Sequence, residues 1–90
     1  MGAMIDTIRL KITEALEPSR LDVVDDSARH ARHAGAQPGG ETHFNLVIEA
    51  NAFEGLSKVA RQRLVYRILA DELATTLHAL SVKALAPGET

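Results

Sequence analysis

Residues 42–50 alternate between polar and apolar side chains with a period of two. In an extended chain, Phe44, Leu46 and Ile48 fall on one face, whereas the opposite face is mostly polar. The pattern therefore predicts a half-buried β-strand over this range. The sequence Phe53-Glu54-Gly55 that follows is typical of a turn, and Ser57 is a suitable N-cap for a helix after it.

Apolar residues also recur at helical spacing near the start of the chain, which predicts a packing helix. These residues are Ile5, Ile8, Ile12, Ala15 and Leu16. We expect Lys11 and Glu14 on the outer face of this helix. Pro18 should end it, because the residue before a proline avoids the α conformation.

A second helical segment is predicted over residues 57–77. Its broad apolar stripe consists of Val59, Leu64, Val65, Ile68, Leu69, Leu73 and Leu77. The charged residues Arg61, Arg63, Arg67 and Glu72 lie off this stripe. The segment is either one long helix or a short helix followed by a longer one, with the break near residues 61–63.

Two shorter strands are predicted over residues 21–25 and 79–84, so the element order is α-β-β-α(-α)-β. This order is typical of an α+β fold. Strands joined by a loop pair antiparallel, whereas a helical crossover lets the last strand run parallel to its neighbour. We therefore expect a mixed three-stranded sheet with helices on one face. The connection over residues 27–40 is too long for a hairpin loop and is expected to be mobile.

The composition sets further limits. The 90 residues suffice for a single domain over residues 1–90, and we expect flexible ends at 1–4 and 87–90. The net charge of −2 gives no general attraction to nucleic acid or to an anionic membrane. No apolar run reaches the length of a spanning helix and no signal-peptide pattern is visible, so the expected location is cytoplasmic, away from any membrane.

Histidines are the main candidates for site chemistry, because the chain has no cysteine. His30 and His33 lie in the long connection, where they could meet one ion or be solvated. His43 is expected to be a surface residue of its strand. His78 lies where the second helical segment ends, and it could interact with the last helix carbonyls.

Catalysis finds little support in the sequence. Asp25, Ser27 and His30 are close along the chain, but a catalytic triad is defined by geometry on a rigid scaffold. No phosphate-binding glycine loop and no dinucleotide fingerprint occur. We therefore predict that the protein is not an enzyme.

The central motif resembles the BolA family. It runs Gly39-Gly40-Glu41-Thr42-His43-Phe44, then Phe53-Glu54-Gly55, Ser57, Val59, Arg61, Arg63, Val65 and Tyr66. The similarity extends upstream to Val23-Val24-Asp25-Asp26-Ser27 and downstream through Ala70-Asp71-Glu72-Leu73 to His78-Ala79-Leu80. It covers nearly the whole chain, from about Ile5 to Pro87.

The resemblance implies a fold related to the type II KH domain. It also implies a [2Fe-2S] cluster shared with a monothiol glutaredoxin. In this family one ligand is a histidine just before the final strand, which corresponds to His78. The other is a His or Cys in the loop between the first two strands. Counting from Ser27 gives His30, and counting back from His43 favours His33, which we prefer slightly.

The implied function is a non-catalytic adaptor in iron–sulfur cluster assembly, trafficking or iron sensing. Because the chain lacks cysteine, the thiolates would come from the glutaredoxin and from glutathione. The isolated chain, a monomer or weak homodimer, is then expected to bind a cluster weakly or not at all.

A DNA-binding transcriptional regulator is the alternative that the resemblance also supports. One helical segment is basic, with Lys58, Arg61, Arg63 and Arg67. The negative net charge, the few aromatic residues and the lack of a Gly-x-x-Gly loop argue against it. The family often has Arg-His-Arg where this chain has Arg61-Gln62-Arg63, so any role of that histidine is in doubt.

Overall fold

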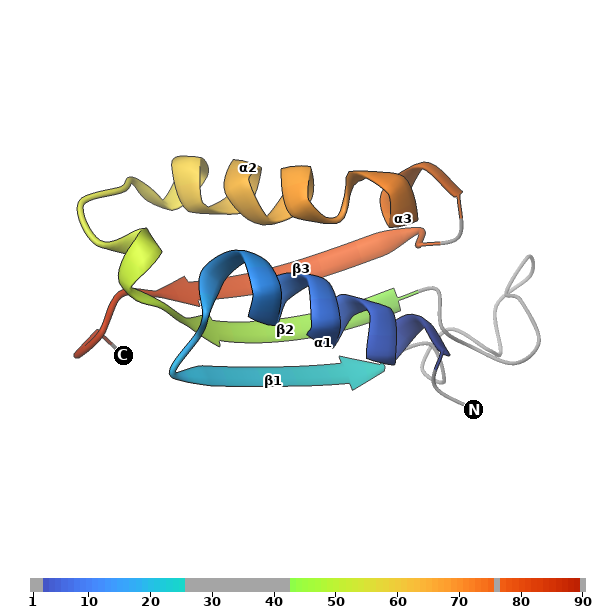
Figure 1. The fold of residues 1–90 in the computed structure, drawn as a ribbon. Coiled ribbons are helices and arrows are strands. Elements are labelled where there is room, and N and C mark those ends of the chain that lie inside the picture. The colour runs from blue at the N-terminus through green and yellow to red at the C-terminus, as the bar shows by residue number, and fades with distance from the viewer. Residues whose placement is uncertain (1–2, 26–42, 76, 90) are drawn as a thin grey trace.

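A computed structural model describes residues 3–25, 43–75 and 77–89 of the chain (Figure 1). The elements in chain order are helix α1 (Ala3–Leu16), strand β1 (Arg20–Asp25), strand β2 (His43–Glu49), the 3-10 turn η2 (Asn51–Phe53), helix α2 (Lys58–Ile68), helix α3 (Ala70–Thr75) and strand β3 (Ala79–Leu85). This order confirms the predicted α+β fold in its form with two helical segments between the second and third strands.

The three strands form one mixed sheet in the order β1-β2-β3. β1 runs antiparallel to β2, with Val23 opposite Leu46. β3 runs parallel to β2, with Leu80 opposite Phe44, because α2 and α3 return the chain to the same end of the sheet. The predicted mixed topology is confirmed, and it makes β2 the central strand and β3 an edge.

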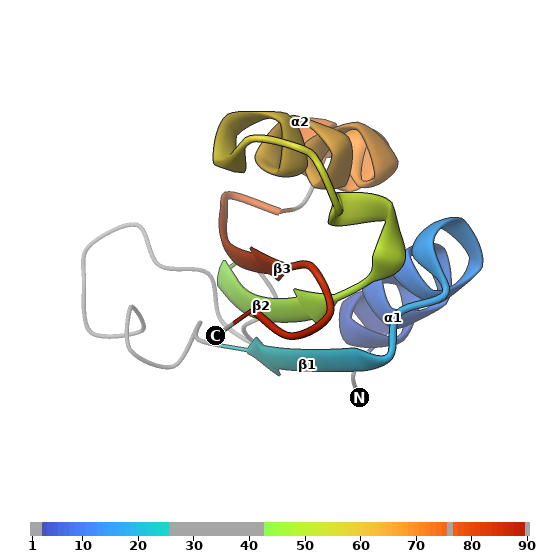
Figure 2. The same ribbon diagram turned by 90° about the vertical axis from the view of Figure 1, so that its left-hand side faces the viewer.

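The helices pack on one face of the sheet, as Figure 2 shows. α1 lies over β1 and β2, whereas α2 lies along β3. The alternation of β2 sends Phe44, Leu46 and Ile48 into this interface, where each is at most 2% exposed. The fully buried partners from the other elements are Ile8, Ile12, Phe53, Val65 and Leu69. The period-two pattern therefore decides which face of the sheet is covered.

α1 buries the predicted residues Ile8, Ile12 and Leu16. It ends where Glu17 adopts a positive φ of 45° and donates its N–H to the Thr13 carbonyl, one residue before Pro18. Lys11, which was expected on the outer face, is half-buried, and its ammonium lies 2.8 Å from the Glu72 carboxylate on α3. The Glu72 hydrogen bond, opposed in part by desolvation, raises the Lys11 pKa.

α2 begins as predicted, with the Ser57 side chain accepting a hydrogen bond from the Ala60 N–H. The predicted break near residues 61–63 is wrong, because the irregular residue is Leu69, with φ −103° and ψ 21°. Leu69 is fully buried. Val59, predicted on the apolar stripe, is 59% exposed.

Ala3 and Met4 belong to α1, and the carboxylate of Glu89 is bound by Arg61. The flexibility expected of residues 1–4 and 87–90 stays a prediction. The predicted mobile connection 27–40 lies outside the described residues. Within residues 3–25, 43–75 and 77–89, no helix is long and apolar enough to cross a membrane.

Candidate functional site: a histidine pair and a basic helix

Two histidines meet at the end of the sheet where β2 and β3 both begin. His43 is the first residue of β2, and its register partner on β3 is Ala79. His78 immediately precedes Ala79 along the chain. The parallel register therefore brings together two residues that are 35 positions apart in the sequence.

The two imidazole rings contact each other edge to face. Their centroids are 6.1 Å apart and the ring planes are inclined by 67°. His78 is exposed and His43 is half-buried. Both rings thus lie at the rim of the sheet, whereas the sequence indicated only that His43 was a surface residue.

The position of His78 is fixed by the residue before it. Leu77 is 2% exposed, and its N–H donates to the Glu72 carbonyl at 2.8 Å. This bond satisfies the Glu72 carbonyl of α3. The buried Leu77 therefore holds the backbone next to His78, whose own side chain is exposed at the rim of the sheet.

The other predicted ligands, His30 and His33, lie outside the described residues. The segment that carries them is attached at Asp25 and at His43. Asp25 is opposite Phe44 in the antiparallel ladder, so both attachment points lie at the same end of the sheet as His78. Both ends of this segment therefore join the sheet at the end where the histidine pair lies.

The side chains at this rim that could ligate a metal ion are the imidazoles of His43 and His78. No group of three or more His, Cys, Asp or Glu side chains is arranged for a metal within the part of the chain that the structure describes. Iron in a [2Fe-2S] cluster and structural zinc both take four ligands. The residues present fit a partial ligand set, which other side chains, solvent or a partner must complete.

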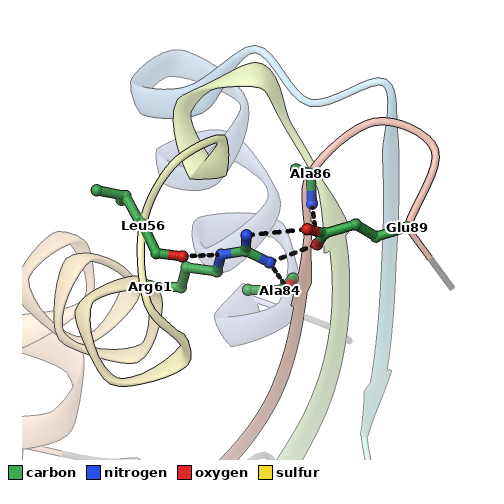
Figure 3. A network of polar contacts seen from close by, with 5 residues as sticks. All are labelled: Leu56, Arg61, Ala84, Ala86 and Glu89. Atoms are coloured by element: carbon green, nitrogen blue, oxygen red, sulfur yellow. Dashed lines mark hydrogen bonds and ion pairs between the residues drawn. The ribbon is translucent and has the colours of Figure 1, made fainter.

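The predicted basic helix divides into exposed and buried residues. Lys58, Arg63 and Arg67 are exposed. Arg61 is 8% exposed, so the structure corrects its expected position off the buried face. Its guanidinium donates to the Leu56 and Ala84 carbonyls and to both carboxylate oxygens of Glu89 (Figure 3). Arg61 therefore ties α2 to the chain end, and it is not presented to a phosphate.

The same network alters the ionisation of Glu89. The Arg61 hydrogen bond, the Ala86 N–H and the nearby positive charges lower the pKa of Glu89 from its ordinary 4.5 to about 2. The bidentate contact is the strong form of an arginine–carboxylate pair. In the folded protein the Glu89 carboxylate is therefore ionised at neutral pH and held in place by Arg61.

Side chains of α2 also cover the outer edge of β3. Gln62 donates to the Val82 carbonyl at 2.6 Å, and the Tyr66 hydroxyl donates to the Leu80 carbonyl at 2.9 Å. Together with the Arg61 contact to Ala84, they satisfy three alternate carbonyls that face away from β2. An unpaired edge is a template for association with another strand, so this arrangement protects it. Gln62 thus has a structural role that the sequence did not indicate.

A half-open groove of about 570 Å³ lies between the start of α2 and the end of β3. Its lining includes Leu56, Lys58, Lys83 and Glu89. Neither His43 nor His78 lines it, because the histidine pair is at the other end of β3. The groove and the histidine rim are therefore separate features.

Together, the mixed sheet, the one-sided helical layer and the edge-covering α2 define a small α+β domain. The solved BolA domain of SufE1 from Arabidopsis thaliana superposes with a TM-score of 0.89 at 47% identity, covering 100% of this chain and 99% of that one. The sequence also matches the family described as BolA-like protein over residues 12–89. The chain belongs to the BolA-like protein family, and the predicted family assignment is confirmed.

Two curated relatives define the extent of the match. The chain is 50% identical to SufE-like protein 1, chloroplastic/mitochondrial, of Arabidopsis thaliana over 93 residues, covering 99% of this chain and 25% of that protein. It is 46% identical to Protein BOLA1, chloroplastic, of the same plant, covering 92% of this chain and 53% of that protein. The chain thus spans a quarter to about half of these proteins. Their names refer to organelles, so a cytoplasmic location stays a prediction.

Proposed function

We propose that the protein is a non-catalytic adaptor that shares a [2Fe-2S] cluster with a monothiol glutaredoxin and contributes histidine ligands to it. The cluster assembly, trafficking or iron sensing that the BolA resemblance implied would follow from this contact. His78 is the proposed ligand before the final strand, and His33 or His30 is the predicted ligand from the connection between β1 and β2.

One observation carries the proposal: His78 is exposed at the rim of the sheet, within ring contact of a second imidazole. An interior His78, or one at the end of the sheet opposite the attachment points of residues 26–42, would have removed the basis for a shared site. Because His78 is exposed, its imidazole is accessible to a partner.

The chemistry of the chain explains why a partner is needed. It has no cysteine, so it supplies no thiolate. When bound, a [2Fe-2S] cluster supplies one-electron redox chemistry, and neutral imidazole in place of an anionic thiolate raises its potential. Imidazole is largely neutral and able to ligate near pH 7. His78 would therefore complete a coordination shell that the glutaredoxin cysteine and glutathione begin.

The test is reconstitution of the full chain with a monothiol glutaredoxin, glutathione, iron and sulfide. We expect a mixed complex with a visible circular dichroism spectrum that differs from that of the glutaredoxin alone. His78→Ala should remove this difference, and Arg63→Ala, an exposed change away from the rim, should preserve it. If the spectrum with the wild-type chain equals that of the glutaredoxin alone, the proposal is wrong.

The alternative, a DNA-binding regulator, is favoured by the exposed Lys58, Arg63 and Arg67 on α2. It must operate without Arg61, which Glu89 neutralises inside the fold. In that case the affinity for duplex DNA should fall steeply with salt, and each removed phosphate contact should reduce the salt slope by about 1. Arg63→Ala and Arg67→Ala should show this reduction, whereas His78→Ala should not.

A further inference from the structure

The rings of His43 and His78 lie close to the separation expected of two ligands to one metal ion. With metal–nitrogen bonds of about 2 Å, two imidazole centroids on a tetrahedral ion stand roughly 5 Å apart. The observed separation is 6.1 Å. A closure of about 1 Å is within the reach of small side-chain rotations, since the terminal torsion of histidine has a broad energy minimum.

Both backbones are already placed for this role. His43 begins the central strand, which is hydrogen-bonded to β1 on one side and to β3 on the other. His78 is held by the buried Leu77. A ligand pair on a formed sheet requires no further ordering of the main chain, so binding does not pay the entropy of ordering it.

We propose that His43 is a metal ligand, and that it forms with His78 a two-imidazole half-site for a borderline transition-metal ion, independent of His30 and His33. Imidazole suits ions such as Co²⁺, Ni²⁺, Cu²⁺ and Zn²⁺ as well as iron. In the isolated chain, water completes the coordination of a single divalent ion. The identification of the ion with an iron of the shared cluster rests on the proposed function, whereas the placement of the two ligands does not.

The test is a titration of the full isolated chain with Co²⁺ alone, followed by the visible ligand-field bands and by calorimetry. We expect one ion per chain. His43→Ala and His78→Ala should each weaken binding by at least about tenfold, and the double variant should be no weaker than about the worse single variant, since the two residues act on one ion. The control, His30→Ala combined with His33→Ala, should change the affinity by less than about twofold.

Amide NMR spectra of each variant establish that it is folded, and His43→Gln provides a second, polar replacement at the half-buried position. Unchanged Co²⁺ affinity in both His43 variants would overturn the inference and leave the ring contact as packing. Failure of the wild-type chain to bind Co²⁺, or loss of binding in the control double variant, would overturn it as well.

This outcome is separable from that of the proposed function. Loss of Co²⁺ binding in the His43 variants, with no cluster-containing glutaredoxin complex, would retain the half-site and reject the adaptor. A cluster complex that forms with wild-type spectra in His43→Ala would retain the adaptor and reject His43 as a ligand of the cluster.

Discussion

Arg61 on α2 and Glu89 after β3 form a bidentate ion pair, although they are 28 residues apart in the sequence (Figure 3). The same guanidinium reaches the Leu56 and Ala84 carbonyls, and Glu89 accepts the Ala86 N–H. One arginine thus joins the turn before α2, the end of β3 and the chain end. Arg61, although it lies in a basic stretch of the sequence, therefore holds three segments of the fold together.

This pair should make stability depend on pH. The Glu89 pKa is about 2 in the folded protein, below its ordinary 4.5, so the stabilisation is fully present above about pH 4.5 and is lost as the pH falls toward 2. Glu89→Gln should flatten the fall in the free energy of unfolding between about pH 5 and about pH 2. Urea denaturation at a series of pH values measures the free energy of unfolding for the wild type and the variant.

The matched control is Glu54→Gln, at an exposed position in the turn before α2. It should keep the wild-type pH dependence. Equal slopes for Glu89→Gln and the wild type would show that the ion pair does not form in solution.

The covering of the β3 edge predicts a second effect on stability. Tyr66→Phe removes only the hydroxyl that donates to Leu80, and Gln62→Ala removes the donor to Val82. Each should lower the free energy of unfolding by about 1 kcal/mol, the usual net value of one hydrogen bond. Thermal and chemical denaturation provide the measurement.

The control is Arg63→Ala. Arg63 lies between Gln62 and Tyr66 in the sequence and is exposed, so this substitution should change the free energy of unfolding by less than about 0.5 kcal/mol. The double variant Gln62→Ala with Tyr66→Phe leaves two edge carbonyls without these donors. Concentration-dependent self-association of that variant, followed by analytical ultracentrifugation, is therefore expected. Stability and association equal to the wild type would mean that these contacts do not protect the edge.

The pairing of β1 with β2 predicts unequal costs on the two faces of the sheet. Ile48 is 0% exposed and packs against the helices, so Ile48→Val should lower the free energy of unfolding by about 1 kcal/mol. Val24 on β1 is 54% exposed, so Val24→Ala should cost less than about 0.5 kcal/mol. A one-residue slip of register would exchange the faces. The opposite ranking in denaturation experiments would therefore contradict the strand pairing.

Gly55 provides a test of backbone strain. Its φ is +79°, and a Cβ added there would meet nothing within 4 Å. Gly55→Ala should therefore cost about 1 kcal/mol through conformation alone. Gly55→Asn should cost less, because asparagine tolerates the left-handed region better than alanine. Equal unfolding free energies for the two variants would argue against a left-handed residue at this turn.

The secondary structure was largely readable because it depends on local periodicity. The alternation of Phe44, Leu46 and Ile48 indicated the central strand and its buried face, and Pro18 and Ser57 indicated helix ends. The break at Leu69 was missed, since no glycine or proline marks it.

Pairing between distant side chains was not readable in the same way. Lys11 had an outward position in its helix pattern, but α3 brought Glu72 beside it. Arg61 lies in a basic stretch of the sequence, but in the structure it forms an ion pair with Glu89, which follows β3. The charges were visible in the sequence, whereas their partners depended on how helices and strands pack.

The sequence by itself determined the element order, the mixed sheet and the family, because these follow from local pattern and motif. Only the tertiary structure decided that His43 stands beside His78, that Arg61 is an internal tie and that Gln62 covers an edge carbonyl. The reason is physical: parallel pairing of β2 and β3 through a helical crossover sets contacts across tens of residues. No local periodicity encodes which side chains that crossover brings together.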